Sequence, residues 1–319
     1  MRSLVTGADG FVGQWLVREL LEHGDDVSGM TRGDHTQLTT LPTDQATQVR
    51  WSSAELLEPD TLHAVVKGAR PDVVYHLAAQ ASVAQSLRDP AGTIETNVIG
   101  TANVLEACRA HAPEARVVAV GSAEIYGAVD PSELPLSESA PIRPNNPYAG
   151  SKAAAEVLAM QYAQTGWLRV VATRSFNHTG PGQSTAFAAA GFAKQCADIT
   201  RGKQAPVLRH GNLSAQRDFL DVRDVVAAYR LLGAKGASGS VYNVCSGRAV
   251  SMREIVEELT QAVGRPVELR QDPDRMRPVD TPIIVGDSGK LARDTGWQPS
   301  IPLLRTLRDL YEYCLKEDG

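Results

Sequence analysis

The chain lacks several features that would place a protein in a class at once. No uninterrupted apolar run approaches the roughly 20 residues that a membrane-spanning helix needs. The sequence contains no internal repeat and no low-complexity segment. Hydrophobic residues make up 43% and charged residues 22% of the chain, which is ordinary for a globular protein and argues against disorder. We therefore expect a folded chain without a membrane span, and its 319 residues favour two domains or one elaborated domain.

Basic charge and paired cysteines are also scarce. The formal net charge of −5 argues against a surface for nucleic acid or anionic lipid. Cys108, Cys196, Cys245 and Cys314 are widely separated and form no CxxC pair, which predicts reduced, packed thiols and neither a metal site nor a disulfide framework. The N-terminal MRSLVTGADG enters a strand and a glycine turn immediately, which leaves no room for a cleavable signal peptide. A cytoplasmic location is therefore expected.

Valine-rich apolar runs alternate with amphipathic segments through the first half of the chain. The runs are short, and the segments between them carry apolar residues at helical spacing. This alternation is typical of a parallel sheet with helices on both faces, so the sequence predicts an α/β fold. The expected strands span residues 2–6, 25–30, 47–53, 71–79, 115–123 and 168–175, and the clearest helices span 11–24 and 97–111.

The alternation breaks after the sixth of these strands. Residues 176–218 are rich in Gly, Asn, Gln and Ala, and residues 247–319 have a shorter period interrupted by prolines. Between them, DVRDVVAAYRLLG and VYNVCSG predict one more helix and strand of the sheet. We therefore assign residues 1–175 and 219–246 to the main domain, and residues 176–218 and 247–319 to a smaller one.

The stretch TGADGFVG places Gly7, Gly10 and Gly13 at the first strand-to-helix junction. In a dinucleotide site, the first glycine permits a tight turn, the second lets the backbone approach a pyrophosphate, and the third lets helix and strand pack closely. The helix N-terminus then stabilises the anion. The GxxGxxG spacing differs from the GxGxxG pattern, and an ordinary turn is the alternative. Its position at the first such junction favours dinucleotide binding.

The end of the second strand bears on which dinucleotide is bound. An acidic residue there would bind the ribose 2′-hydroxyl and repel a 2′-phosphate, but Thr31 occupies this place and Arg32 follows. An arginine can bind a phosphate with two parallel hydrogen bonds. NADP(H) is therefore favoured over NAD(H). The alternative is that Arg32 is a solvated loop cation whose field is weakened by Asp34.

Tyr148 and Lys152, in NPYAGSK, stand four residues apart after a proline, so a helix presents both on one face. Ser122 ends the fifth strand, and open parallel sheets bind ligands beyond the carboxyl ends of their strands. A phenol has a pKa of about 10, which we expect the Lys152 ammonium and a bound nicotinamide ring to lower. Ser122 would hold the reacting oxygen while Tyr148 gives or takes the proton. Taken singly, a half-buried anchor and a surface cation are simpler interpretations of the tyrosine and the lysine, but the glycine turn and the strand-end serine favour catalysis.

The motifs TGADGFVG, HLAAQASV, GSAEIYG, YAGSK and RDFLDVRD, in this order, resemble the extended short-chain dehydrogenases/reductases that act on nucleotide sugars. The resemblance covers essentially the whole chain. It implies a Rossmann-type, doubly wound parallel sheet for NAD(P), a smaller C-terminal domain for the sugar nucleotide, and catalytic roles for Ser122, Tyr148 and Lys152. The cofactor site that it implies contains Gly7, Gly10, Phe11, Val12, Gly13, Thr31, Arg32, Glu55, Leu56, Leu77, Ala78, Ala79, Asn97, Tyr148 and Lys152.

Further segments narrow the resemblance to one activity. RSFNHTGPGQSTAF, HGNLSAQRDFLDVRD and RPVDTPIIVGD are most similar to family members that reduce the C4 ketone of GDP-4-keto-6-deoxy-D-mannose, giving GDP-D-rhamnose or its C4 epimer. The expected substrate-binding residues are Ser82, Ser122, Asn177, Lys194, Arg217 and Arg277. Among them, Arg217 and Arg277 are expected to bind the pyrophosphate, because guanidinium groups suit phosphate oxygens. An ion pair with Asp218 or Asp221 is the alternative for Arg217, and an exposed helix cation is the alternative for Lys194.

Two other functions stay open. A GDP-mannose 4,6-dehydratase needs a carboxylate to move the C5 proton, and Glu124, two residues after Ser122, has the right reach. A hydrogen bond to local backbone is an equally simple role for this carboxylate. The dehydratases carry an arginine-rich stretch where this chain has TGPGQSTAFAA, so the reductase is favoured. A non-catalytic NADP(H)-sensing protein is the other alternative, although such proteins typically lose the tyrosine or the lysine.

The helix after Lys152, AAAEVLAMQYAQ, is crowded with alanine. Small side chains permit close approach of a second helix, and related enzymes pair this helix with the preceding long one. The pattern therefore predicts a homodimer. The alternative is that the alanines only let this helix lie flat on its own sheet.

Overall fold

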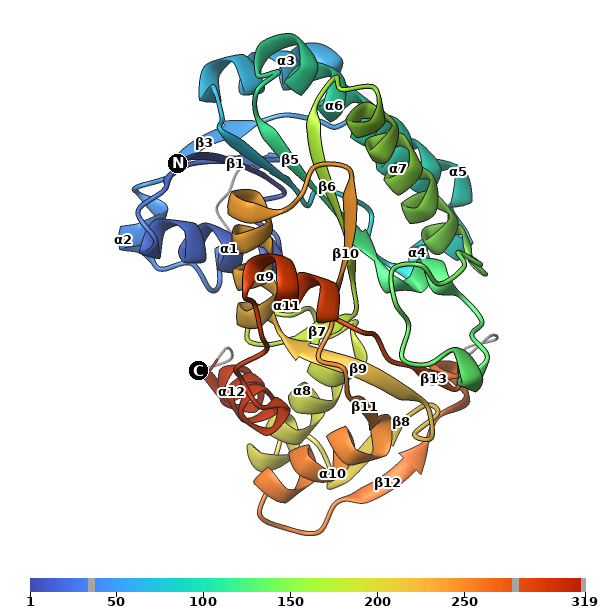
Figure 1. Ribbon diagram of the computed structural model, residues 1–319. Coiled ribbons are helices and arrows are strands. Elements are labelled where there is room, and N and C mark those ends of the chain that lie inside the picture. The colour runs from blue at the N-terminus through green and yellow to red at the C-terminus, as the bar shows by residue number, and fades with distance from the viewer. Residues whose placement is uncertain (34–37, 277–280, 317–319) are drawn as a thin grey trace.

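The computed structural model of the chain describes residues 1–33, 38–276 and 281–316. Its larger part is built on a sheet of seven strands that all run parallel to their neighbours (Figure 1). In sheet order, these strands are β10 (Ser240–Val244), β6 (Arg169–Ser175), β5 (Arg116–Ser122), β4 (Val73–His76), β1 (Arg2–Thr6), β2 (Asp26–Thr31) and β3 (Arg50–Ser53). The sheet grows outward from β1 in both directions, so β1 and β4 flank the switch point at which such sheets bind ligands.

Helices cover both faces of this sheet. One face carries α1 (Phe11–Glu22), α9 (Val222–Lys235) and α11 (Gly289–Thr295), and the other carries α3 (Pro59–Ala69), α6 (Gly100–His111) and α7 (Pro147–Gln164). The connections contain α2 (Thr43–Ala46), α4 (Val83–Arg88), α5 (Pro90–Ile94), the π-helix η1 (Glu95–Ile99) and the 3₁₀ turns η2 (Ala123–Tyr126) and η3 (Pro131–Glu133). The Rossmann-type, doubly wound α/β fold predicted from the sequence is therefore confirmed.

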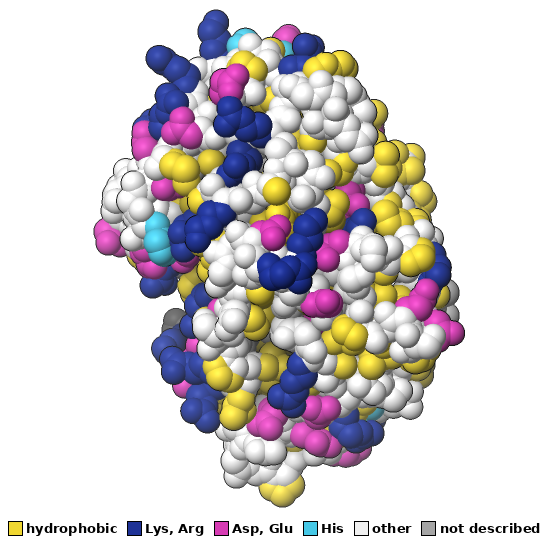
Figure 2. Space-filling view, in the orientation of Figure 1, with side chains coloured by type: hydrophobic (Ala, Val, Ile, Leu, Met, Phe, Trp, Pro, Cys, Tyr) yellow, Lys and Arg dark blue, Asp and Glu magenta, His cyan; other side chains and the backbone are white. Residues whose placement is uncertain are grey.

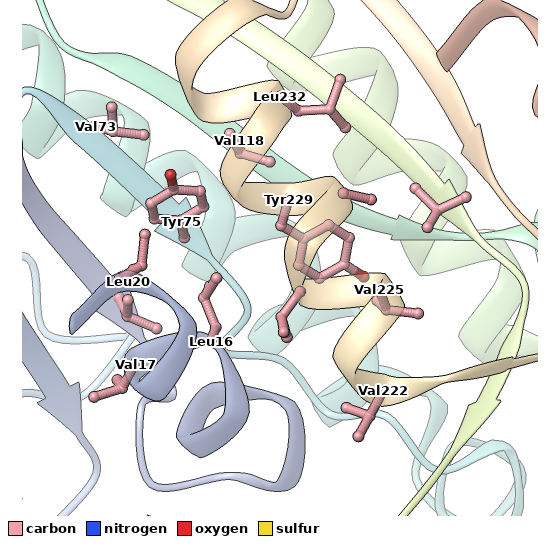
Figure 3. Packing of buried hydrophobic residues seen from close by; sticks show 14 of the residues in the cluster. Leu16, Val17, Leu20, Val73, Tyr75, Val118, Val222, Val225, Tyr229 and Leu232 are labelled. Atoms are coloured by element: carbon pink, nitrogen blue, oxygen red, sulfur yellow. The ribbon is translucent and has the colours of Figure 1, made fainter. Parts of the chain in front are cut away.

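The alternation of side chains along each strand divides the core into two layers. Leu4 of β1 packs toward α3 and α6, whereas its neighbour Val5 packs toward α1 and α9, because successive strand side chains point to opposite faces. Figure 3 shows the second layer, in which Leu16 of α1 and Tyr229 of α9 meet over Tyr75 of β4. A strand buried on both faces reads as a continuous apolar run, which explains the valine-rich segments of the sequence.

A smaller region lies below the sheet in Figure 1 and has its own core. Its strands are β7 (Asn177–Thr179), β8 (Val207–His210), β9 (Gln216–Asp221), β11 (Ala249–Ser251), β12 (Glu268–Gln271) and β13 (Ile283–Ile284), and its helices are α8 (Ala188–Thr200), α10 (Met252–Ala262), α12 (Leu303–Lys316) and the 3₁₀ turn η4 (Pro273–Arg275). Strand β9 is the centre of one small sheet, because β7, β11 and β13 all pair with it.

The helix and strand expected after the break are present as α9 and β10, and β10 extends the main sheet beside β6. The division into two domains stays a prediction. Within the stretch assigned to the smaller domain, Leu291 and Trp297 pack into the core of α1 and α9, and the indole Nε1 of Trp297 donates to the Asp224 carbonyl at 2.9 Å. This late segment therefore helps to cover the main sheet.

All four cysteines are buried as free thiols. Across the ranges that the structure describes, no helix combines the length and the apolar composition needed to cross a membrane.

Candidate active site

The glycine turn between β1 and α1 requires glycine at Gly7 and Gly13. Gly7 has a φ of +69°, in the left-handed region, and a Cβ on Gly13 would lie 2.1 Å from the Gly7 carbonyl oxygen. Gly10 is the N-cap of α1 and has no side chain with which to cap it, so the first amide groups of the helix stay open to an anion. The bare backbone and the exposed helix N-terminus therefore fit a dinucleotide pyrophosphate.

The carboxyl ends of β2 and β4 flank this turn. Thr31 is buried at the end of β2, and its hydroxyl donates to the Gly33 carbonyl at 2.6 Å, while Arg32 is exposed. The backbone of Ala78, just after β4, lies 3.1 Å from the position of a Cβ on Gly7. Leu77 and Ala79 beside it are half-buried.

Five further residues assigned to the cofactor lie in the adjacent loops and helices. Asn97, in η1, donates to the carbonyl of Gln80 at 3.0 Å and accepts from its amide at 2.8 Å, so it fixes the loop after β4. Leu56 packs against the start of α6, where a Cβ on Gly100 would lie 2.9 Å from it, and Glu55 is exposed. Phe11 stacks on His178 with ring centroids 6.4 Å apart, and Val12 occupies the first turn of α1.

Ser122, Tyr148 and Lys152 meet at the carboxyl end of β5. Ser122 is the last residue of β5, and Tyr148 and Lys152 lie one turn apart at the start of α7, as their spacing predicts. The start of α7 is set by Asn146, whose side chain accepts from the Ala149 amide at 2.9 Å. Tyr148 is 9% exposed and hydrogen bonds with Ser122. The ammonium of Lys152 donates to the Val120 carbonyl at 3.0 Å.

Burial sets the pKa values of this pair. It raises the pKa of Tyr148 to about 12, against a smaller lowering by the hydrogen bond with Ser122, and the charge of Glu124 adds to the rise. Burial also lowers the pKa of Lys152 to about 8. The lowering of the tyrosine pKa that we expected from Lys152 is therefore not found, because burial dominates and the groups that act on this pKa are Ser122 and Glu124. The part of the lowering expected from a bound nicotinamide stays a prediction.

Lys152 also lines a small cavity that nothing in the sequence predicted. Its volume is about 20 Å³, room for about one water, and its lining includes His76, Thr101 and Glu156. The two ring nitrogens of His76 form hydrogen bonds with the hydroxyls of Thr6, at 2.9 Å, and Thr101, at 3.1 Å. Burial, and to a smaller extent the charge of Lys152, lowers the pKa of His76 to about 3. The available signal was its position at the end of a buried strand, in HLAAQ.

Glu124 follows Ser122 in η2. Its amide donates to the Ser122 hydroxyl at 3.2 Å, and its carboxylate is close enough to influence the Tyr148 pKa. The alternative that the sequence offered, a hydrogen bond from the Glu124 carboxylate to local backbone amides, is not among the hydrogen bonds of the described residues, because the bond seen here uses the backbone amide of Glu124.

Ser122, Asn177 and Arg217, three of the six expected substrate-binding residues, lie on strands that follow one another from the main sheet to β9. Ser122 of β5 pairs with Ser175, the last residue of β6. Two residues after Ser175, the exposed Asn177 begins β7 and pairs with Phe219 of β9. Arg217, two residues before Phe219, is buried. Asn177 therefore lies between the catalytic strand ends and the strand of Arg217.

The remaining candidates differ in their surroundings. The Arg217 guanidinium donates to the carbonyls of Gln216 at 2.8 Å and Thr281 at 2.7 Å. Lys194 forms an ion pair with Asp198 at 2.6 Å on its own helix and is half-buried. Ser82 is the N-cap of α4 and accepts from the Gln85 amide at 3.2 Å. Arg277 lies outside the described residues.

The sequence is similar to those of known proteins along essentially the whole chain. Residues 4–310 match the family described as GDP-mannose 4,6 dehydratase. The chain is 39% identical to GDP-6-deoxy-D-mannose reductase of Pseudomonas aeruginosa, over 96% of this chain and 95% of that protein. It is 31% identical to UDP-glucose 4-epimerase of Mycolicibacterium smegmatis, over 98% of this chain and 98% of that protein.

Two solved structures show the same fold. RMD from Pseudomonas aeruginosa complexed with NADPH has a TM-score of 0.84 and 36% identity, with 99% of each chain covered. UDP-glucose 4-epimerase from Thermus thermophilus in complex with NAD has a TM-score of 0.87 and 31% identity, with 99% of this chain and 100% of that chain covered.

Proposed function

Because this chain belongs to the GDP-mannose 4,6-dehydratase family of extended short-chain dehydrogenases/reductases, we propose that it reduces the C4 ketone of GDP-4-keto-6-deoxy-D-mannose with NADPH. The product would be GDP-D-rhamnose or its C4 epimer. The observation that carries the proposal is the meeting of Ser122, Tyr148 and Lys152 at the edge of the sheet from which the glycine turn also leaves, in a chain 39% identical to a GDP-6-deoxy-D-mannose reductase.

Each residue of the trio has a separate task. When bound, the nicotinamide supplies the hydride that reduces the carbonyl carbon. Ser122 donates a hydrogen bond to the ketone oxygen, and Tyr148 gives its phenolic proton to the same oxygen as negative charge develops there. The raised pKa of Tyr148 keeps the phenol protonated near neutral pH, which is the form that a reduction requires. Lys152 brings its own ammonium group close to the tyrosine, and this group can donate hydrogen bonds to the ribose of the cofactor.

Two observations support NADP(H) as the cofactor. Arg32 is exposed at the end of β2, where proteins that bind the ribose 2′-hydroxyl of NAD have an acid, and a 36% identical chain of the same fold was solved with NADPH. NAD(H) is the alternative, since the Thermus epimerase was solved with NAD.

The GDP-mannose 4,6-dehydratase stays the second candidate, because the Glu124 carboxylate acts on the Tyr148 pKa and a dehydratase needs a base there. The chain is 27% identical to the GDP-mannose 4,6-dehydratase of Vibrio cholerae over 99% of its length. A non-catalytic NADP(H) sensor is disfavoured, because the serine, tyrosine and lysine are all present and assembled.

Absorbance of NADPH separates these functions. The purified protein is incubated with GDP-mannose alone, and separately with GDP-4-keto-6-deoxy-D-mannose plus NADPH, and the products are analysed. We expect NADPH loss only with the ketone. Formation of the ketone from GDP-mannose without added reductant would identify a dehydratase, and cofactor binding without either reaction would identify a sensor.

We also propose that the protein is a homodimer. The outward face of α7 carries the exposed Ala154 and Val157, which line a shallow apolar depression together with Ala153, Leu158, Gln161 and Ile142. Val157 is 64% exposed. Figure 2 shows hydrophobic side chains gathered on the side where Figure 1 draws α4, α5 and α7. An apolar surface of this kind is typical of a protein–protein contact.

A further inference from the structure

A buried ion pair lies one helical turn after the catalytic lysine. Glu156 follows Lys152 by four residues on α7, so both side chains lie on the same side of the helix. The Glu156 carboxylate accepts three hydrogen bonds from the guanidinium of Arg174, near the end of β6, and the shortest of them is 2.7 Å. Both residues are almost fully buried, with 6% of Glu156 and 5% of Arg174 exposed.

Glu156 borders the same cavity as Lys152. Both residues line this space of about 20 Å³, which has room for about one water. The Lys152 ammonium donates to the Val120 carbonyl, and a Cβ on the next residue, Gly121, would lie 3.9 Å from a carboxylate oxygen of Glu156. The buried ammonium and the buried carboxylate therefore lie beside consecutive residues of β5.

Arg174 neutralises this carboxylate and is itself held in place. Its Nη1 atom donates to the Tyr126 hydroxyl at 3.0 Å and to the Glu138 carbonyl at 2.9 Å. The guanidinium also lies over the ring of Tyr126, at 5.0 Å from its centre. Because the charge of Glu156 is compensated by this fixed guanidinium, Lys152 is left for other partners, and burial is the cause of its lowered pKa.

We propose that Arg174 is a positioning residue that reserves Lys152 for the cofactor. A buried carboxylate without a counter-ion is costly, and an ammonium one helical turn away on the same cavity would neutralise it. By pairing with Glu156, Arg174 prevents the carboxylate from capturing the lysine in this way. The inference rests on the proposed role of Lys152 toward the cofactor ribose and adds a buried residue that acts on this role through Glu156.

The test removes the guanidinium and measures binding of reduced cofactor by nicotinamide fluorescence, with no substrate present. In Arg174→Met, the Glu156 carboxylate has lost its counter-ion and should draw the Lys152 ammonium away from the ribose. We expect the dissociation constant for NADPH to rise about tenfold, the value of one hydrogen bond to a charged group. The constant for NADH should rise equally, because the nicotinamide ribose is common to both cofactors.

A double variant that removes both charges separates this role from a purely structural one. Arg174→Met combined with Glu156→Met leaves no carboxylate to capture the lysine, and apolar replacement of a buried ion pair is often neutral for stability. We expect this variant to bind both cofactors within about threefold of wild type, and thus better than Arg174→Met alone. If Arg174 served only to hold α7 on the sheet, the double variant would bind no better than the single one.

A second pair of variants tests whether the effect passes through Lys152. In a Lys152→Met background, Arg174→Met should weaken cofactor binding no further, because no ammonium is left to capture. Arg174→Gln keeps a donor for the carboxylate but carries no charge, so it should show the same loss as Arg174→Met if that variant does not fold.

Arg230→Met is the matched control. It breaks a partly buried ion pair, that of Arg230 with Glu19 at 2.8 Å, which joins α9 to α1 on the other face of the sheet. No carboxylate is released beside Lys152 by this change, so both dissociation constants should stay unchanged.

Normal cofactor binding by folded Arg174→Met or Arg174→Gln would overturn the role of Arg174, and so would a double variant that binds as weakly as Arg174→Met. Lys152→Met that binds both cofactors as tightly as wild type would overturn the proposed role of Lys152 and this inference with it. Failure of the reductase proposal would not affect these results, because no step of the test requires turnover.

Discussion

At the scale of single residues, burial shifts the pKa values of Tyr148 and Lys152 in opposite directions. Removing water disfavours the charged form of each, so the phenol becomes harder to ionise and the ammonium easier to deprotonate. The phenol is then in its proton-donating form at neutral pH, whereas the lysine titrates close to it. Reduction needs the first property, and the second makes the site sensitive to mild alkali.

Replacing Tyr148 with phenylalanine removes the proton donor and leaves the ring in place. We expect kcat for ketone reduction to fall about 10²–10⁴-fold, the usual contribution of a general acid, while the dissociation constant for NADPH changes little. Stopped-flow absorbance and cofactor fluorescence measure the two quantities. An unchanged kcat would show that the proton comes from another group.

The lowered pKa of Lys152 predicts a pH dependence of stability. Its pKa is about 8 in the folded chain and near its ordinary value of 10.5 when unfolded, so between these values the unfolded chain binds more protons. Stability contributed by this site is therefore lowest below pH 8 and rises as the pH increases toward 10. Relative to Lys152→Met, the wild-type free energy of unfolding should gain roughly 2 kcal/mol between pH 7 and pH 10.

Urea denaturation of both proteins at each pH gives this difference. Because both proteins share every other titrating group, those groups cancel in the comparison. A difference that stays constant, or falls, over this range would mean that Lys152 keeps its charge in the folded chain.

At the scale of elements, the start of α1 depends on the absence of one side chain. A Cβ on Gly13 would lie 2.1 Å from the Gly7 carbonyl oxygen and 2.8 Å from the Ala8 Cα, both backbone atoms that cannot turn aside. Gly13→Ala should therefore destabilise the fold by about 1–3 kcal/mol and weaken NADPH binding at least about tenfold.

Gly68→Ala is the matched control, because a Cβ there meets nothing within 4 Å and Gly68 lies inside α3. It should stabilise the protein by about 0.5–1 kcal/mol and leave cofactor binding unchanged. Thermal unfolding and NADPH fluorescence report both effects. Normal NADPH binding by Gly13→Ala would show that the turn is not the phosphate site.

The elements that the sequence predicted well are those whose signal is local. Strand β5 and helix α1 follow from side-chain periodicity alone, and the start of α7 follows from Asn146 and Pro147. The helix expected at 97–111 is confirmed, but its first residues belong to the π-helix η1, which runs directly into α6 and holds Asn97 toward Gln80. A π-helical turn holds one residue more than an α-helical turn, and this hardly changes the spacing of apolar residues, so the sequence pattern does not distinguish the two.

Contacts between segments that are distant in sequence could not be predicted, because periodicity is a local signal. The hydrogen bonds between the Gln14 side chain and residues 39–41 join parts of the chain whose only shared signal is their final position. The contribution of Lys152 to the tyrosine pKa was overestimated, because a sequence shows the neighbouring lysine but not the depth of burial. Residue types at the site were predictable, and their electrostatic balance was not.

At the scale of the whole molecule, the two helical layers on the main sheet differ in the apolar side chains that they leave exposed. Leu291 and Trp297, from the end of the chain, close the face of α1 and α9. On the opposite side, α7 lies on the sheet but keeps exposed apolar side chains of its own, and Ile94 and Ile99 beside it are about half exposed. A second copy of the chain is the partner that would complete this layer.

Val157→Glu tests that partner. In a two-fold dimer each substitution enters the interface twice, so losing two buried valine contacts of about 1.5 kcal/mol should weaken the dimer more than about 100-fold. Leu304→Glu is the control, because Leu304 is similarly exposed, at 51%, but lies on α12 in the smaller region. Analytical ultracentrifugation should find wild type and Leu304→Glu as dimers and Val157→Glu as a monomer. A dimer that survives Val157→Glu, or a wild type that is monomeric at micromolar concentration, would mean that α7 does not form the contact and that its alanines serve only its own sheet.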